Sequence, residues 1–311
     1  MIVSIMLSAC QPAQSLAQPR NEPEPKVYAP VLGTTQTGFP SMPTPLPNQS
    51  GPWQQDLDIV FSDDGANTFG GAKTLVTRAG VPSLIRDFQG RLLLAFQWFP
   101  ENSPNFDQVA VMISTDNGQT WGAPQPISMS NFPSTMQRPF DPTIVQLPDG
   151  RYRLYYSSSN RGASGALTKP ATYSAVSTDG IHYEFEAGAR FEGSGQVIDP
   201  AVALFNGVWH FTAPVGAPQD GAYHAISSNG IYFARHSNIA SVNNANWTGN
   251  LLAYDDGMRF YGSGPTVWWS FSKDGEVWSN PIFTAVRGGD PAVASLGSKR
   301  YVMVYVTPKR R

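Results

Sequence analysis

Cysteine, histidine and charged residues are all scarce in this sequence. Among its 311 residues are one cysteine, Cys10, and four histidines, and charged residues make up 14%. A single cysteine excludes an intrachain disulfide framework and a cysteine-rich zinc site. Four scattered histidines form no His-based metal site that the sequence reveals. We therefore expect no cofactor, and leave a structural or site-bound cation open.

The sequence also lacks an excess of either basic or acidic residues. Basic residues number 21 and acidic residues 23, for a net charge of −2, and no stripe of Lys or Arg occurs. The electrostatic footprint of a nucleic-acid binder is missing, so we expect no nucleic-acid partner. In contrast, 29 Gly and 27 Pro accompany 41% hydrophobic residues. Such an abundance of turn formers disfavours an all-helical protein, and the length suits one large β architecture.

The N-terminus is typical of an exported protein. Residues 1–9 are mostly apolar but too short to span a bilayer, as in a signal peptide or the truncated end of one. Leu7-Ser8-Ala9-Cys10 resembles the bacterial lipobox, which implies lipidation of Cys10 and, with Gln11 next, an outer-membrane location. A chance match or an upstream start is the alternative. Residues 10–55 are rich in Pro, Gln, Ser and Thr and predict a disordered tether.

Five short segments repeat along the chain, and their starts are separated by 52, 63, 50 and 45 residues. Each segment has a serine, an Asp or Asn, a glycine and a following aromatic residue. This pattern suits a hairpin turn in which the Asp or Asn side chain accepts hydrogen bonds from backbone amides of the turn. The motif resembles the Asp-box of sialidases and related propellers. Its copies are Ser62-Asp63-Asp64-Gly65, Ser114-Thr115-Asp116-Asn117-Gly118, Ser177-Thr178-Asp179-Gly180, Ser227-Ser228-Asn229-Gly230 and Ser272-Lys273-Asp274-Gly275.

A second repeat, an apolar strand followed by a tight turn and another strand, lies between these boxes. Its copies begin at Val81-Pro82, Asp141-Pro142, Asp199-Pro200, Gly249-Asn250 and Asp290-Pro291. Together the two repeats predict an all-β, single five-bladed β-propeller over residues 56–311. The last blade lacks its outer half, which the N-terminal segment supplies, closing the ring without an exposed edge.

Strand direction places the Asp-Pro starts at one end of every blade, opposite the Asp-boxes. Asp141, Asp199 and Asp290 should therefore meet at the mouth of the central funnel. Three carboxylates in one pocket are costly unless they are solvated, protonated or bound to a cation. A structural role is equally compatible with the pattern: an Asp before Pro can accept amide hydrogen bonds from a neighbouring blade, with its backbone held extended.

The segment Val197-Ile198-Asp199-Pro200-Ala201-Val202, followed by Asn206-Gly207, resembles inner strands of the five-bladed glycosidases of the arabinanase, invertase and levansucrase superfamily, including glycoside hydrolase family 43. The resemblance implies an Asp base or nucleophile, a Glu acid and an orienting Asp. By position Asp199 would orient, and Asp290 or Asp141 would be the base. No Glu begins a repeat, so Glu192 is the first choice of acid, before Glu101 and Asp107.

The implied partner is carbohydrate, bound by a monomer that meets the membrane only through its lipid anchor. Arg138, Arg287, Trp98 and Glu101 are the candidate substrate-binding residues. Two alternatives remain: a non-catalytic glycan-binding or surface-interaction propeller, and a sialidase-like hydrolase. The second would need an arginine cluster at the funnel, for which Arg138, Arg259 and Arg287 are available, with Tyr261 nearby. His210 and His224 are interpreted as strand residues rather than ligands or bases.

Overall fold

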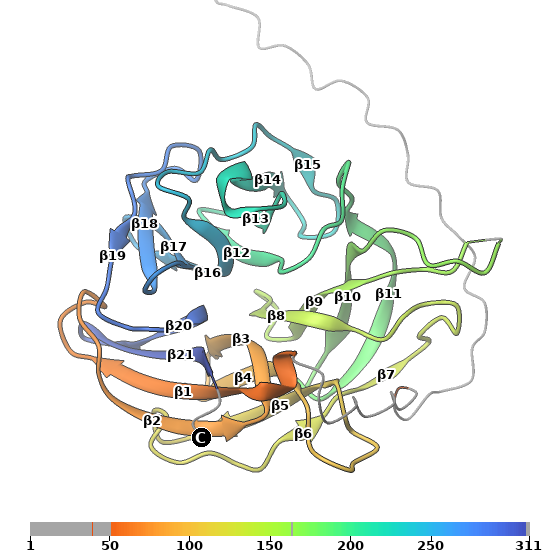
Figure 1. Cartoon of the computed structure of the whole chain (residues 1–311), viewed down its shortest axis with the longest axis horizontal. Coiled ribbons are helices and arrows are strands. Elements are labelled where there is room, and N and C mark those ends of the chain that lie inside the picture. The colour runs from red at the N-terminus through yellow and green to blue at the C-terminus, as the bar shows by residue number, and fades with distance from the viewer. Residues whose placement is uncertain (1–38, 40–50, 163, 309–311) are drawn as a thin grey trace, which may run out of the picture.

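Five antiparallel sheets surround a central axis in the computed structural model, which describes residues 39, 51–162 and 164–308 (Figure 1). The helices among these residues are two 3-10 turns, η1 (Pro52–Gln54) and η2 (Pro218–Asp220). No helix in this part of the chain is long and apolar enough to cross a membrane. The predicted five-bladed β-propeller is thereby confirmed. The residues proposed as signal peptide and lipidation site, Cys10 included, lie outside the described residues.

Each blade begins with an inner strand near the axis and adds strands outward. Blade 1 contains β3 (Ala79–Arg86), β4 (Leu92–Trp98), β5 (Gln108–Ser114) and β6 (Gln125–Pro126). Blade 2 contains β8 (Phe140–Gln146), β9 (Tyr152–Ser158), β10 (Ala171–Ser177) and β11 (His182–Phe191), with β7 (Ser128–Ser130) added in parallel to β11. Blade 3 contains β12 (Ala201–Phe205), β13 (Val208–Pro214), β14 (Ala222–Ser227) and β15 (Ala234–Arg235). Blade 4 contains β16 (Asn246–Tyr254), β17 (Gly257–Ser263), β18 (Trp268–Ser272) and β19 (Ile282–Phe283).

Blade 5 combines the two ends of the described chain. Its strand order is β2 (Gly70–Thr77), β1 (Gln55–Ser62), β21 (Arg300–Pro308) and β20 (Gly289–Gly297). The antiparallel register between β1 and β21 runs without interruption from Gln55↔Pro308 to Ser62↔Tyr301. This pairing covers the edge that β21 would otherwise expose, so the ring closes through backbone hydrogen bonds.

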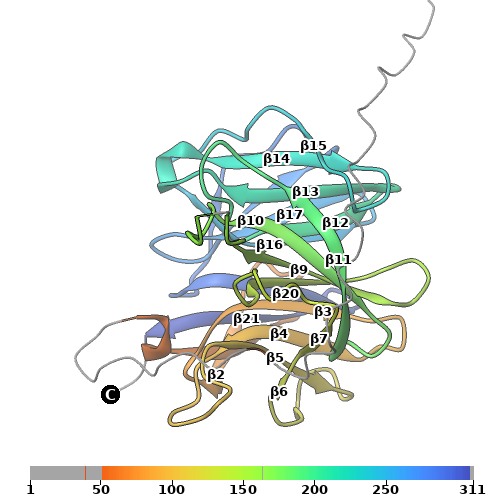
Figure 2. The same cartoon turned by 90° about the vertical axis from the view of Figure 1, so that its right-hand side faces the viewer.

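The hydrophobic core is divided among the interfaces between neighbouring blades. Alternate residues of β4 show the division: Leu92, Leu94 and Phe96 pack toward blade 5, whereas Leu93 and Ala95 pack toward blade 2. Similar clusters lie between blades 2 and 3, 3 and 4, and 4 and 5. The second strands β4, β9 and β13 are buried along most of their length, and apolar side chains predominate in them. Figure 2 shows the same sheets from the side.

The Asp-box turns are built in the same way. In the turn after β5, the Ser114 hydroxyl accepts from the Gly118 amide at 2.9 Å and donates to the Asp116 carboxylate at 2.8 Å. The glycine has a left-handed backbone, φ 83°, which a residue with a side chain rarely adopts. The equivalent serine donates to the Asp or Asn side chain in the other four turns. These residues hold turns at the end of the blades that faces away from the Asp-Pro starts.

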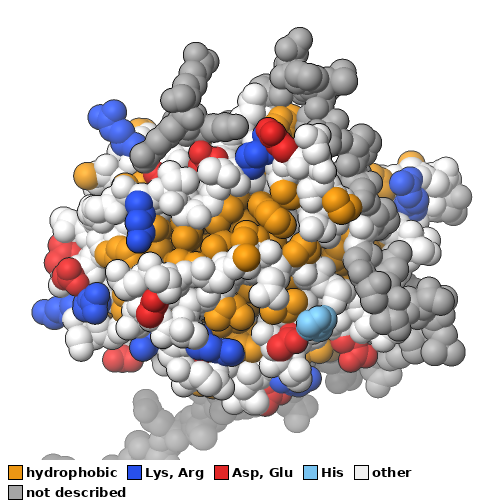
Figure 3. All heavy atoms as spheres, turned by 90° about the horizontal axis from the view of Figure 1, so that it is seen from below, with side chains coloured by type: hydrophobic (Ala, Val, Ile, Leu, Met, Phe, Trp, Pro, Cys, Tyr) orange, Lys and Arg blue, Asp and Glu red, His pale blue; other side chains and the backbone are white. Residues whose placement is uncertain are grey.

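Phe39 lies within the segment that the sequence predicts to be a tether. Its ring packs on that of Phe132, with 5.1 Å between centroids in an edge-on arrangement. The side chain is buried in the cluster between blades 1 and 2. At least this point of the N-terminal segment therefore contacts the propeller. On the face of the molecule seen in Figure 3, hydrophobic side chains gather toward the middle, and charged side chains of both signs are interspersed around them.

Candidate functional site

A narrow cavity lies where the inner strands begin, at one end of the ring. Its volume is about 10 Å³, which has room for about one water molecule. All five blades supply its lining, at the starts of the second repeat. The lining residues are Val81, Pro82, Pro142, Thr143, Asp199, Pro200, Gly249 and Asp290.

The backbone at this cavity has an unusual conformation in four blades. Val81, Asp141, Asp199 and Asp290 have φ of 47°, 49°, 51° and 43°, the left-handed region, although a proline follows each. The expectation that these residues are extended is therefore wrong. The reason is a break in strand register at this point, between Phe140 and Thr143 in blade 2 for example, because a bulge turns the residue out of the ladder. Such strained positions are found at functional sites, but Val81 shows that the repeat alone can impose the conformation.

The three aspartates come together as the sequence predicts. The Asp199 amide donates to the Asp141 carboxylate at 3.3 Å, and Asp141 is 9% exposed. Burial, offset in part by this hydrogen bond, and the nearby charge of Asp290 raise the pKa of Asp141 to about 7. Burial and the charges of the other two carboxylates raise the pKa of Asp199 well above its ordinary value. Burial also raises the pKa of Asp290, although Thr248 and Ser263 hydroxyls partly oppose it.

These shifts have a chemical consequence. Carboxyl groups this close cannot all ionise near neutral pH, so at least one keeps its proton while another is a carboxylate. A carboxylic acid beside a carboxylate is the pair that acid–base hydrolysis of a glycosidic bond requires. The cluster supplies this pair from aspartates alone.

Of the two arginines proposed to bind substrate, one lies in the packed rim beside blades 1 and 2. Arg138, just before β8, forms a buried ion pair with Asp107, which also accepts from the Gln97 amide. Burial lowers the pKa of Arg138 to about 10. Its buried Nη1 has no hydrogen-bond partner among the described residues. A buried guanidinium nitrogen without a partner is an unsatisfied hydrogen-bond donor, which is uncommon in folded proteins.

None of the other candidates is among the residues that line the cavity. Glu192 follows β11, is exposed, and is not among the lining residues of the cavity. Arg287 is also exposed. Glu101 pairs with Arg78 at 2.7 Å in the loop after β4, and Trp98 is half-buried against the core between blades 1 and 5.

Arg259 lies at the opposite end of the molecule, contrary to its expected place near the funnel. Its guanidinium donates to the Gly65 carbonyl at 3.0 Å, in the Asp-box turn of blade 5, and lies over the ring of Trp269 at 4.2 Å. The position follows from its place near the start of β17, directly after the Asp-Gly turn. Tyr261 is buried and shares a hydrogen bond of 2.8 Å with Tyr254. The arginine cluster that a sialidase-like site needs is therefore not assembled from Arg138 and Arg259.

Three of the four histidines lie together in space, a grouping that their spacing in the sequence does not reveal. His210 and His224, on adjacent strands of blade 3, stack with 5.8 Å between ring centroids, and His236 contacts His224 edge-on. Burial lowers the pKa of both stacked imidazoles, that of His224 to about 4. Spacing could not reveal the group, because Glu276, which completes it, comes from a turn of blade 4.

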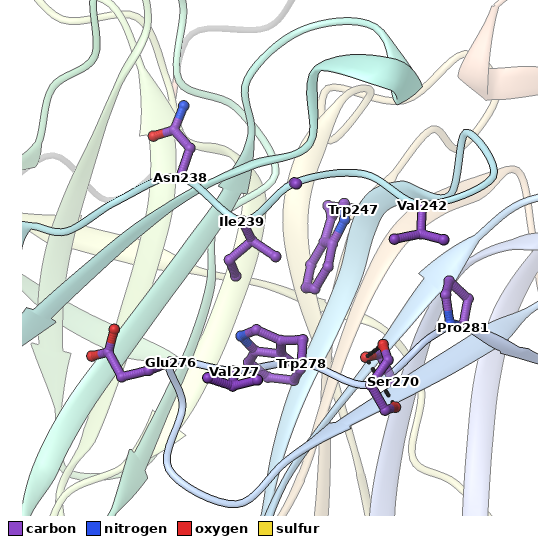
Figure 4. A pocket seen from close by; sticks show the side chains of 11 residues that line it. Asn238, Ile239, Val242, Trp247, Ser270, Glu276, Val277, Trp278 and Pro281 are labelled. Atoms are coloured by element: carbon purple, nitrogen blue, oxygen red, sulfur yellow. Dashed lines mark hydrogen bonds between the residues drawn. The ribbon is translucent and has the colours of Figure 1, made fainter.

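A larger cavity adjoins this group. It lies between blades 3 and 4, has a volume of about 280 Å³, and is lined by Trp247, Trp278 and Glu276 among others. In Figure 4, Glu276 lies at one end of the lining and Pro281 at the other, with the two tryptophans between them.

Comparison with known proteins finds likeness in structure. No protein-family model matches the chain, and no curated protein sequence does. The Bombyx mori GH32 β-fructofuranosidase has 13% identity and a TM-score of 0.53, over 72% of this chain and 54% of that one. This chain therefore spans about half the length of that enzyme.

Two further solved structures are similar. A thermostable family-43 glycoside hydrolase has 11% identity and a TM-score of 0.50, over 73% of this chain and 88% of that one. An N-acetylgalactosamine deacetylase from F. plautii has 12% identity and a TM-score of 0.50, over 76% and 80%. The expected likeness to five-bladed glycosidases is confirmed at the level of the fold, which at these identities is what the comparisons establish.

Proposed function

We propose that this chain is a glycan-processing propeller that hydrolyses glycosidic bonds at the mouth where Asp141, Asp199 and Asp290 meet. The observation that carries the proposal is the gathering of these three carboxyl groups, from three blades, into one cluster with raised pKa values; Asp141 is buried and the other two are half-buried. Similar folds in proteins named as glycoside hydrolases support it.

The roles are assigned from what surrounds each carboxyl group. Asp199 receives the charges of both other carboxylates, so it is the group that keeps its proton and donates it to the leaving oxygen. Asp290, whose charge two hydroxyl groups stabilise, is the base or nucleophile. Asp141 holds the Asp199 backbone through its 3.3 Å hydrogen bond and modulates the acid. This assignment moves the acid from Glu192 to Asp199, because Glu192 is exposed and outside the cavity.

The sugar would bind in the mouth rather than inside the cavity, since about 10 Å³ admits a water but not a pyranose ring. Arg138, in the rim beside blades 1 and 2, is the proposed contact to a sugar hydroxyl; because its Nη1 is buried, this contact requires the side chain to move toward the mouth. The water that fits beside the aspartates is the proposed attacking or resolving nucleophile.

The second candidate function is non-catalytic glycan binding. The small cavity and the absence of a glutamate from its lining favour it. The similar fold of a deacetylase also shows that this architecture is not confined to glycosidases. In this case the aspartates would stabilise the strand starts of neighbouring blades, and the mouth would bind sugar without cleaving it.

The proposal includes a location outside the cytoplasm, with the propeller anchored by a lipid on Cys10. It is supported by Leu7-Ser8-Ala9-Cys10 and by the Pro-rich segment between that cysteine and the propeller. Metabolic labelling with a palmitate analogue in a bacterial host, compared with Cys10→Ser, tests it directly.

The decisive experiment screens aryl glycosides and plant and host polysaccharides with the wild type and three variants. Asp199→Asn and Asp290→Asn should lose activity by at least about 100-fold, as expected for groups that transfer protons. Glu192→Gln is the matched control and should retain activity. Loss in Glu192→Gln alone would return the acid role to Glu192. Binding without turnover, in the wild type and the variants alike, would establish the non-catalytic function instead.

A further inference from the structure

Three potential metal ligands converge at the junction of blades 3 and 4. They are Nδ1 of His224 on β14, Nδ1 of His236 directly after β15, and the carboxylate of Glu276 in the turn after β18. One ligand atom from each residue lies within 4.8 Å of the other two. Glu276 oxygens lie 3.2 Å from His236 Nδ1 and 3.9 Å from His224 Nδ1. Ligands around a tetrahedral zinc are about 3.3 Å apart, given Zn–N distances of about 2.0–2.1 Å.

We propose that His224, His236 and Glu276 bind a divalent transition metal, best matched to Zn²⁺, at a site separate from the aspartate cluster. Two imidazoles and one carboxylate form a donor set that suits zinc and leaves a fourth position for water. The group belongs to two different blades, so the metal would join blade 3 to blade 4.

The surroundings orient the ligands. His210 Nδ1 lies 3.5 Å from Nε2 of His224, so a proton on this Nε2 can be donated toward His210 while Nδ1 of His224 stays free for a metal. Partners of this kind orient metal-binding histidines. The His236 backbone amide donates to the His224 carbonyl at 2.8 Å, and this bond holds the two histidines side by side.

The turn that carries Glu276 is also fixed against the histidines. The Glu276 amide donates to Asp274 at 2.9 Å, within the Asp-box. A Cβ added to Gly275 would lie 2.3 Å from His210 Cε1, so the turn packs directly on the stacked rings. The ligands are thus positioned by the fold before a metal arrives.

A metal can reach the site from solvent. The side chain of Glu276 is 47% exposed and that of His236 is 35% exposed, whereas His224 is buried. Glu276 also lines the cavity of about 280 Å³ between the blades. A water at the fourth position would be exchangeable.

The test uses the full chain without a polyhistidine tag, freed of metal with EDTA and titrated with ZnCl₂ at pH 7 by calorimetry. We expect one zinc per chain and a higher melting temperature with zinc than without. Loss of a partner that merely orients a ligand weakens metal binding about 10- to 100-fold, so Glu276→Gln and His236→Gln should weaken it by at least as much. Both residues are partly exposed, so the variants should fold, as circular dichroism would verify.

His182→Gln is the matched control. His182 also lies beside a carboxylate, with 2.7 Å between its Nδ1 and an oxygen of Asp179. Among the described residues, no third potential metal ligand lies close enough to this pair to form a site. Its removal should leave zinc binding unchanged. A visible Co²⁺ spectrum typical of tetrahedral coordination, present in the wild type and in His182→Gln, would support the site. Absence of stoichiometric binding in the wild type, or equal affinity in Glu276→Gln and His236→Gln, would overturn the proposal.

Discussion

Replacing Asp141 by Asn should make the propeller more stable at high pH. The pKa of Asp141 is about 7 in the folded chain, against an ordinary value of 3.8. This difference corresponds to about 4 kcal/mol of stability lost when the carboxyl must be ionised. Asn has nearly the same shape, and its Oδ1 can still accept the Asp199 amide. The substitution removes the charge and keeps the hydrogen bond.

The direction in which stability changes with pH follows from proton binding. Because the folded pKa lies above the unfolded one, the folded chain binds more protons between the two values. The wild type therefore has its full stability below about pH 4 and loses stability as the pH rises toward 7. Asp141→Asn lacks this loss. The two proteins should be equally stable at pH 4 and differ by up to about 4 kcal/mol at pH 8.

Urea unfolding at pH 4 and pH 8, followed by tryptophan fluorescence, measures the difference. Asp149→Asn in the turn after β8 is the matched control, because its exposed carboxylate pairs with Arg151, which lowers its pKa. That variant should lose at most about 1 kcal/mol at pH 8. The reasoning is refuted if Asp141→Asn is less stable than the wild type at pH 8, or if its effect is the same at both pH values.

Three further substitutions test the ring itself. Gly249→Ala should lower the free energy of unfolding by at least about 3 kcal/mol, because the added Cβ would lie 2.0 Å from the Tyr261 carbonyl oxygen. At Gly297 an added Cβ meets open space, so Gly297→Ala should lower it by only about 1 kcal/mol, through the positive φ. Equal melting temperatures of the two variants would contradict this. Arg259→Ala should lower stability by about 2 kcal/mol through loss of its contacts with Trp269 and Gly65, and should leave any glycan cleavage intact. A loss of cleavage at unchanged stability would instead place Arg259 in the site.

The ring could be inferred from the sequence because repeats carry their own geometry. An Asp-box needs a glycine at positive φ and a serine hydroxyl that accepts from the glycine amide, as Gly118 and Ser114 show. These few neighbouring residues therefore identify a turn wherever the motif occurs. The incomplete last repeat implied that its missing strands lay at the other end of the chain. Equivalent positions in a closed ring must converge, and this placed Asp141, Asp199 and Asp290 together.

Residues in irregular segments could not be placed in this way. Glu192 is the predicted acid because the links between blades reach the funnel. These links carry no repeat that fixes their direction, however, and the structure leaves this side chain exposed. The backbone at the Asp-Pro starts was expected to be extended. Its left-handed form depends on a register break that tertiary pairing imposes.

The amino-acid sequence alone determined the number of blades, the two ends of each blade and the meeting of the aspartates, because strand alternation and turn chemistry are local and repeat. Only the tertiary structure decided which side chains from different repeats touch. His224 and Glu276 face each other because two blades pack at that angle, and Arg259 reaches across to Gly65 for the same reason. Such contacts depend on packing between sheets, which has no period along the chain.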